Sequence, residues 1–333
     1  MTQNEFGKFF KYLKKQGYIV VGPKQVGDKL LMKEIEKPKE MVLDGRLTFY
    51  PPKKYFIPHK ETLFEYKKGK LEEIEPKPQK IAIFGITVFD LKAQALYHQV
   101  FEKDKNFQSR IKNILVIGQS TMPCEEKGFC FWEEDYEEDV LEHLKFDIFL
   151  GFPFRKKSIQ KSFKVFTGSE GGQRILDDFG YKNYEHIDYV GPIKEEGPDK
   201  KMLRIKAKME KHHNPKIWQE LGKICIACGK CALVCPMCFC FDIDDEPELS
   251  RDSGKRVRKW TTCFYDEFSQ IGGGFRFLDT VAKRIHFWYE HKFVRMPQEY
   301  GFMGCTGCGR CIKVCPVGID ITKNLDKILK GRY

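Results

Sequence analysis

The chain has 333 residues, of which 41% are hydrophobic and 32% are charged, and its formal net charge is +11. This composition is typical of a globular protein, and the sequence has no apolar run long enough for a membrane-spanning helix. The N-terminus, MTQNEFGKFF, lacks the apolar stretch of a secretion signal, so we expect a cytoplasmic protein. The length favours two domains.

The first part of the chain predicts an α/β domain. Residues 1–79 mix short apolar runs with Gly and Pro and are expected to form strands and loops. Residues 80–180 alternate between strand and helix patterns, with a helix expected from Asp90 to Phe101. Apolar runs predict strands at residues 81–85, 114–118, 146–150 and 163–166. The segment Gly168–Gly172 lacks the spacing of known phosphate-binding loops, which favours a structural turn and helix cap.

The second part of the chain predicts helices around cysteine motifs. Residues 181–220 are polar and are expected to connect the two domains. The clearest helix pattern runs from Asp279 to Arg295, with Pro297 after its end. We therefore predict an α+β protein, with an α/β domain over residues 1–200 and a helical, ferredoxin-type domain over residues 201–333.

Most of the 13 cysteines lie in two short runs. The runs are Cys225-x2-Cys228-x2-Cys231-x3-Cys235-Pro and Cys305-x2-Cys308-x2-Cys311-x3-Cys315-Pro. This is the spacing of bacterial two-cluster ferredoxins, in which the fourth cysteine of each run ligates the other cluster. We expect one [4Fe-4S] cluster on Cys225, Cys228, Cys231 and Cys315, and a second on Cys305, Cys308, Cys311 and Cys235.

Zinc is the alternative metal, because a repeated C-x2-C pair also occurs in zinc ribbons. A four-ligand zinc site has no role for the third cysteine at x2 spacing or for the Cys-Pro ending. The pattern therefore favours iron–sulfur clusters.

Three further cysteines, Cys238, Cys240 and Cys263, follow the first run. Two hypotheses are open for them: a third iron–sulfur or metal centre with a fourth ligand from elsewhere, or free thiols that pack as small hydrophobic groups. In the first domain, Cys124 and Cys130 are five residues apart, a spacing that matches no familiar motif. A redox or metal role for that pair is the weaker expectation.

The residues from Cys225 to Asp242, with Trp260–Cys263 and Cys305–Asp320, resemble the iron–sulfur beta subunit of soluble sulfhydrogenases and the A subunit of anaerobic sulfite reductase. Segments of the first domain fit this family more loosely. The family often has Cys-Phe-Cys near position 130, where this chain has Gly128-Phe-Cys-Phe131. The resemblance implies a relay of electrons between a flavin-containing NAD(P)H subunit and a catalytic hydrogenase or sulfur/sulfite reductase subunit.

The residues after position 200 include 24 Lys and Arg against 15 Asp and Glu. Much of the excess comes from Arg256, Arg258, Lys259, Lys283, Arg284, Lys292 and Arg295. A basic surface favours nucleic-acid binding, which gives the alternative function of an iron–sulfur nucleic-acid-binding protein. Anionic clusters also require nearby cations, however. No nucleophile–base, flavin or nicotinamide motif is recognisable, so we expect a non-catalytic electron-transfer subunit whose first domain docks a partner or covers the clusters.

Overall fold

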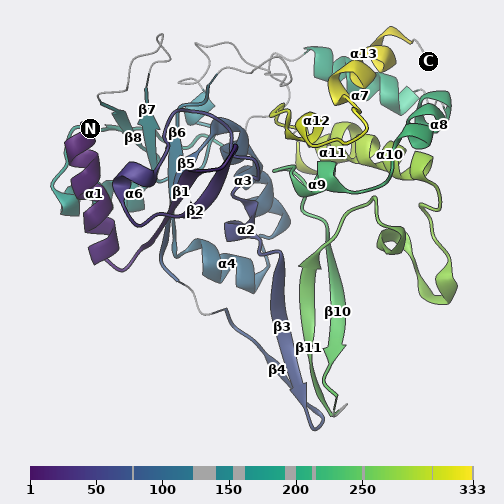
Figure 1. Ribbon diagram of the computed structural model, residues 1–333, viewed down its shortest axis with the longest axis horizontal. Coiled ribbons are helices and arrows are strands. Elements are labelled where there is room, and N and C mark those ends of the chain that lie inside the picture. The colour runs from purple at the N-terminus through teal and green to yellow at the C-terminus, as the bar shows by residue number, and fades with distance from the viewer. Residues whose placement is uncertain are drawn as a thin grey trace. The chain divides into compact units, whose positions relative to one another are not determined.

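The computed structural model describes residues 1–76, 79–122, 140–152, 162–191, 200–211, 215–249, 252–301 and 303–331 (Figure 1). The chain divides into two compact units. The first contains the described residues within 1–56, 76–124 and 132–193, and the second contains those within 57–75 and 194–333. Residues 57–75 therefore belong to the second unit, which differs from the single boundary expected at residue 200. The physical reason is strand pairing across a long sequence separation.

The first unit is built on a seven-stranded sheet with the order β2-β1-β5-β6-β7-β8-β9. The strands β1, β5, β6 and β7 are parallel, whereas β2 and β8 run antiparallel to their neighbours β1 and β7. The bounds are β1 Ile19–Val26, β2 Lys29–Glu34, β5 Ile81–Ile86, β6 Ile114–Gln119, β7 Ile148–Gly151, β8 Lys164–Thr167 and β9 Glu185–His186. All four strands predicted between residues 80 and 180 are present, because their apolar runs are buried on both faces.

Among the helices of the first unit, α1 Gln3–Lys15 precedes β1, and the others lie in the segments between the strands, at α2 Lys53–Phe56, α3 Val88–Val100, α4 Lys105–Ile111 and α6 Glu170–Phe179. The helix α1 corrects the expectation of only strands and loops before residue 80. Thr2 and Glu5 form a capping box at its start, and its apolar face packs Phe6 and Phe9 against Phe84 of β5. At α6, Ser169 accepts a hydrogen bond from the Gly172 amide at 3.0 Å, which confirms the expected helix cap.

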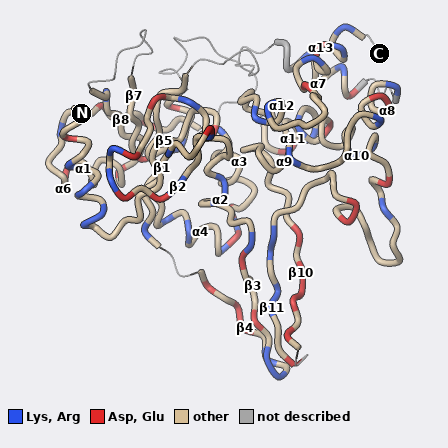
Figure 2. Tube along the Cα trace, viewed as in Figure 1, with Lys and Arg blue, Asp and Glu red and all other residues tan. Residues whose placement is uncertain are grey.

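A four-stranded antiparallel sheet with the order β10-β11-β3-β4 forms one part of the second unit (Figure 1). Its strands are β3 Lys60–Lys67, β4 Lys70–Glu73, β10 Phe241–Pro247 and β11 Ser253–Trp260. The sequence prediction missed β10 and β11. Both strands contain few apolar residues, and charged residues face each other across the sheet: Asp245 of β10 faces Arg256 of β11, and Glu61 of β3 faces Arg258 of β11. Figure 2 shows acidic residues along β10 and basic residues along β11.

Helices pack around the cysteine runs in the rest of the second unit. They are α7 Lys200–Lys211, α8 Pro215–Ile224, α9 Lys230–Leu233, α10 Val281–Glu290, α11 Met296–Tyr300, α12 Arg310–Lys313 and α13 Ile321–Lys330, with a π-helical turn at His291–Arg295. Their core includes Ile205, Trp218, Ile285 and Phe293. The helices α7 and α8 occupy much of the segment that was expected to be only a connection. Within the described residues, no helix is long and apolar enough to cross a bilayer.

Candidate metal centre

The two cysteine runs have the same backbone conformation. In each run, a glycine with positive φ precedes a one-turn helix: Gly229 before α9 and Gly309 before α12, both with a φ of 70°. The residue before the second cysteine of each run also has positive φ, 52° at Ala227 and 78° at Gly307. This left-handed conformation is disfavoured for alanine, so the fold of the run imposes it at Ala227. The repeat in the sequence is therefore a repeat of structure.

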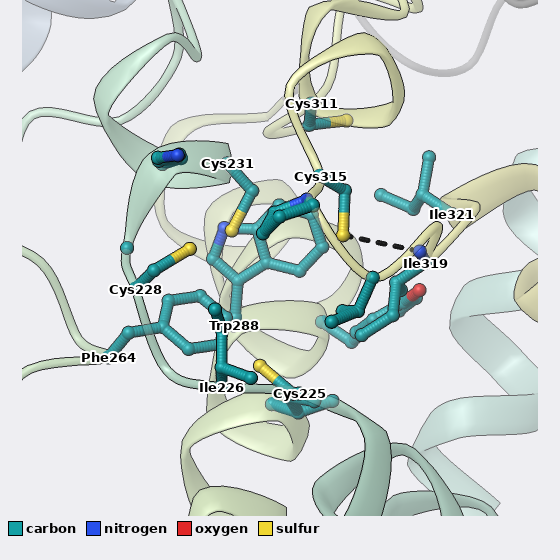
Figure 3. A pocket seen from close by; sticks show the side chains of 16 residues that line it. Cys225, Ile226, Cys228, Cys231, Phe264, Trp288, Cys311, Cys315, Ile319 and Ile321 are labelled. Atoms are coloured by element: carbon teal, nitrogen blue, oxygen red, sulfur yellow. Dashed lines mark hydrogen bonds between the residues drawn. The ribbon is translucent and has the colours of Figure 1, made fainter.

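The last cysteine of the second run lies with the first three cysteines of the first run. Cys225, Cys228, Cys231 and Cys315 line one pocket, together with Cys311 of the second run, and Figure 3 shows these five side chains around it. Burial raises the pKa of the Cys225 thiol, and the nearby Cys228 and Cys315 raise it further. Backbone amides point at two of the sulfurs: Ile319 donates to Cys315 Sγ at 3.2 Å, and Ala227 donates to Cys225 Sγ at 3.4 Å.

The other four cysteines form a second group. Burial raises the pKa of the Cys305 thiol to about 12, with Lys292 lowering it and Cys235 raising it. Burial also raises the pKa of Cys311, followed by the charges of Cys305, Cys308 and Cys235. Cys235, from the first run, is thus close to Cys305 and Cys311 of the second run. The helices α9 and α12, which contain Cys231 and Cys311, contact each other.

Unpartnered polar atoms lie beside the thiols. Trp288 Nε1 and Thr306 Oγ1 are two of the three buried side-chain nitrogen or oxygen atoms without a hydrogen-bond partner among the described residues. Trp288 lines the pocket of the first group, and Thr306 follows Cys305 directly. A buried donor without an acceptor is costly, and the sulfur atoms of a cluster are acceptors. The donors, the thiols and the apolar walls therefore fit [4Fe-4S] clusters.

Zinc was the alternative metal for these cysteines. A structural zinc site takes four ligands, which leaves no role for the third cysteine at x2 spacing or for the Cys-Pro ending of each run. Two sets of four thiols are the ligands that two clusters of four irons require, because each sulfur binds a different iron.

The three additional cysteines also lie near the two groups. Burial raises the pKa of Cys263 to about 12, and Cys240 contributes further, so these two thiols are neighbours. A hydrogen bond to Cys235, followed by burial, raises the pKa of Cys238 well above its ordinary value. A third centre on Cys238, Cys240 and Cys263 stays a prediction. Cys124 and Cys130 lie outside the described residues.

The seven basic residues that suggested nucleic-acid binding have partners inside the second unit. Six of them pair with carboxylates, as Arg256–Asp245, Arg258–Glu61, Lys259–Asp244, Lys283–Asp279, Arg284–Asp266 and Arg295–Glu290. The seventh, Lys292, donates a hydrogen bond to Cys235. These seven side chains are therefore engaged within the second unit, whereas the net excess of basic over acidic residues after position 200 stays as the sequence gives it.

Residues 224–319 match the family model of a 4Fe-4S dicluster domain. Along 98% of its length, the chain is 28% identical to the sulfhydrogenase 2 subunit beta of Pyrococcus furiosus, of which 96% is covered. It is a distant, full-length homologue of a sulfhydrogenase beta subunit. No solved structure matches the chain. The protein thus binds two [4Fe-4S] clusters and is an iron–sulfur electron-transfer protein related to that subunit.

The sequence analysis did not single out three residues of this site. Trp288 and Thr306 were not considered, and Lys292 was counted only as part of the basic excess. A signal for Lys292 was available: it falls at the helical spacing of Ile285, Trp288, Tyr289 and Phe293, which are all buried. A lysine in such a series lies in the core and needs an anionic partner.

Proposed function

We propose that this protein relays electrons between a flavin-containing NAD(P)H subunit and a catalytic hydrogenase or sulfur/sulfite reductase subunit in the cytoplasm. The proposal rests on the two groups of thiols, in which the fourth cysteine of each run is assigned to the group formed by the other run. One cluster is assigned to Cys225, Cys228, Cys231 and Cys315, and the other to Cys305, Cys308, Cys311 and Cys235. When bound, each [4Fe-4S] cluster supplies a one-electron carrier.

The residues of the chain bind the clusters and exclude water from them. Side chains such as Phe264, Ile285 and Ile321 line the first pocket together with the thiols. Because such walls lower the local dielectric constant, hydrogen-bond donors near the sulfurs have a strong influence there. Ile319 and Ala227 supply backbone donors, and Trp288 supplies an indole N–H.

The partners follow from the full-length likeness to a subunit of a sulfhydrogenase. A subunit implies other chains, and this chain has no recognisable flavin or nicotinamide motif of its own. Electrons must therefore enter and leave through partner proteins. The first unit is proposed to dock a partner or to cover the clusters.

Anaerobic purification of the tagged chain from its native cells tests the proposal. We expect a flavin-containing subunit and a catalytic subunit to be recovered with it, and NADPH to bleach the visible iron–sulfur absorption of the complex. The variant Cys228→Ser should lose about four irons per chain. Recovery of the chain alone, or salt-sensitive binding to DNA without redox partners, contradicts the proposal.

A further inference from the structure

Lys292 is a buried cation between the two cysteine runs. It is 3% exposed and lies in the π-helical turn His291–Arg295 that joins α10 to α11. A π turn holds one more residue than an α-helical turn, and such insertions are frequent at functional sites. An unpaired buried ammonium would be strongly destabilising, so the neighbours of this Nζ decide what the residue does.

The Nζ of Lys292 joins the end of the first run to the beginning of the second. It donates to Cys235 Sγ at 3.2 Å and to the Gly304 carbonyl at 2.7 Å. The Gly304 amide in turn donates to the Lys292 carbonyl at 2.8 Å. A Cβ on Gly304 would lie 2.9 Å from Lys292 Cα, so only glycine allows this approach. Gly304 immediately precedes Cys305, and the lysine is therefore fixed beside the second group of thiols.

A third contact fixes the position of the ammonium group. The Nζ lies 5.3 Å from the centre of the Trp288 ring, a favourable cation–π position. Together with its hydrogen bonds to Cys235 Sγ and the Gly304 carbonyl, this contact holds the lysine Nζ beside the sulfur atoms.

The first group of thiols has a different electrostatic environment. One nearby buried cation is Arg284, which pairs with the Asp266 carboxylate and donates to the carbonyls of Leu278 and Phe264 at 2.9 and 3.1 Å. The acidic partner offsets the charge of the guanidinium. Lys292 also lies within reach of this group, because burial raises the pKa of the Cys231 thiol and the charge of Lys292 lowers it. Its hydrogen bond to sulfur, however, goes to Cys235 of the second group.

We infer that Lys292 raises the reduction potential of the cluster proposed for Cys235, Cys305, Cys308 and Cys311, and that it affects this cluster more than the other because its hydrogen bond goes to Cys235. A cluster becomes more negative when it accepts an electron, and net charge and hydrogen bonds to the sulfurs set its potential. A buried ammonium stabilises the reduced form. The inference rests on the ligand assignment of the proposed function.

Lys292 variants in the anaerobically purified, cluster-loaded protein test the inference. We expect Lys292→Met to lower one of the two midpoint potentials in a redox titration monitored by electron paramagnetic resonance. The expected change is at least about tenfold in the reduction equilibrium, which is about 59 mV for one electron. Cys308→Ser identifies which signal belongs to the second cluster, and Lys292→Arg should retain most of the potential.

Two further variants separate charge from structure. Lys283→Met is the matched control, because Lys283 lies on α10 and its side chain is 55% exposed in a pair with Asp279; its potentials should be unchanged. Lys292→Gln keeps a hydrogen-bond donor but removes the charge, so it should lower the potential as Lys292→Met does. If the Lys292→Met variant loses iron, the Lys292→Gln variant provides the measurement instead. The inference would be overturned if Lys292→Gln or Lys292→Met kept its full iron content and its midpoint potentials were unchanged. It would also be overturned if Lys292→Arg lowered the potential of the second cluster as much as Lys292→Met does. A wild-type protein without a pair of [4Fe-4S] signals would instead contradict the proposed function.

Discussion

Arg258 and Glu61 form a buried ion pair between two strands that are far apart in the sequence. Arg258 Nη2 lies 2.6 Å from Glu61 Oε1, and the side chains are only 6% and 9% exposed. The pair joins β11 to β3 across 197 residues. Glu61 belongs to residues 57–75, the segment from the N-terminal half of the chain that is part of the second unit.

We predict that Glu61→Ala destabilises the second unit by about 3–5 kcal/mol, because it leaves a buried guanidinium without its partner. The matched control is Glu65→Ala, which breaks the half-exposed pair with Lys255 in the same two strands. That change should cost about 0.2–1 kcal/mol. Denaturant unfolding followed by circular dichroism gives both values. Equal losses in the two variants would show that burial of the pair is unimportant.

Because Cys238, Cys240 and Cys263 are left over from the two clusters, we predict that the iron content per chain exceeds that of two clusters. A third [4Fe-4S] centre would bring the content to about twelve irons per chain, and Cys263→Ser should return it to about eight. Iron and acid-labile sulfide analysis of anaerobically purified protein, with electron paramagnetic resonance, makes the measurement. About eight irons in the unsubstituted protein would mean that Cys238, Cys240 and Cys263 serve only packing.

His98 predicts a loss of stability in mild acid. Burial, followed by the charge of Lys145, lowers its pKa to about 4, against about 6.5 in an unfolded chain. The unfolded state therefore binds the proton first, and stability present above pH 6.5 is lost as the pH falls toward 4. At pH 5 the loss is about 1–2 kcal/mol. Denaturation midpoints at pH 7 and pH 5 should differ less in His98→Phe, and identical pH slopes would contradict the assignment.

The chain alone should not oxidise NADPH, because no dinucleotide-binding fingerprint is visible in its sequence. The measurement is dye reduction by NADPH with the purified chain, freed of flavin-containing partners. Activity should appear when the flavin subunit is added back. Turnover by the isolated chain would require a nucleotide site that the sequence analysis missed.

The hydrophobic pattern of the sequence predicted those strands whose burial depends on their own residues. The strands β5 and β6 are continuous apolar runs, and their burial follows from composition alone. The helix α1 was missed although its signals are local: Phe6, Phe9, Phe10 and Leu13 follow a helical period after a Thr2–Glu5 capping box. The strands β10 and β11 are a different case. Their cross-strand charges and the contribution of β3 come from distant residues, which no local window contains.

The site shows the same division. The spacing of each cysteine run depends on local backbone geometry, so the eight candidate ligands could be named from the sequence. The contact between Lys292 and Cys235 spans 57 residues and depends on a π-helical turn. Such a turn has no reliable sequence signature. The asymmetry between the two groups of thiols was therefore not predictable before the fold was known.

The position of strand β3 limits which truncated fragments of this protein can be stable. It pairs with β11, which pairs with β10 on its other side. A fragment that begins at residue 201 would keep both cysteine runs but would lack β3. The strand β11 would then be an unpaired edge strand, and Arg258 would lack the carboxylate of Glu61. Exposed edges recruit other chains. Such a fragment would aggregate, although every proposed cluster ligand is present in it.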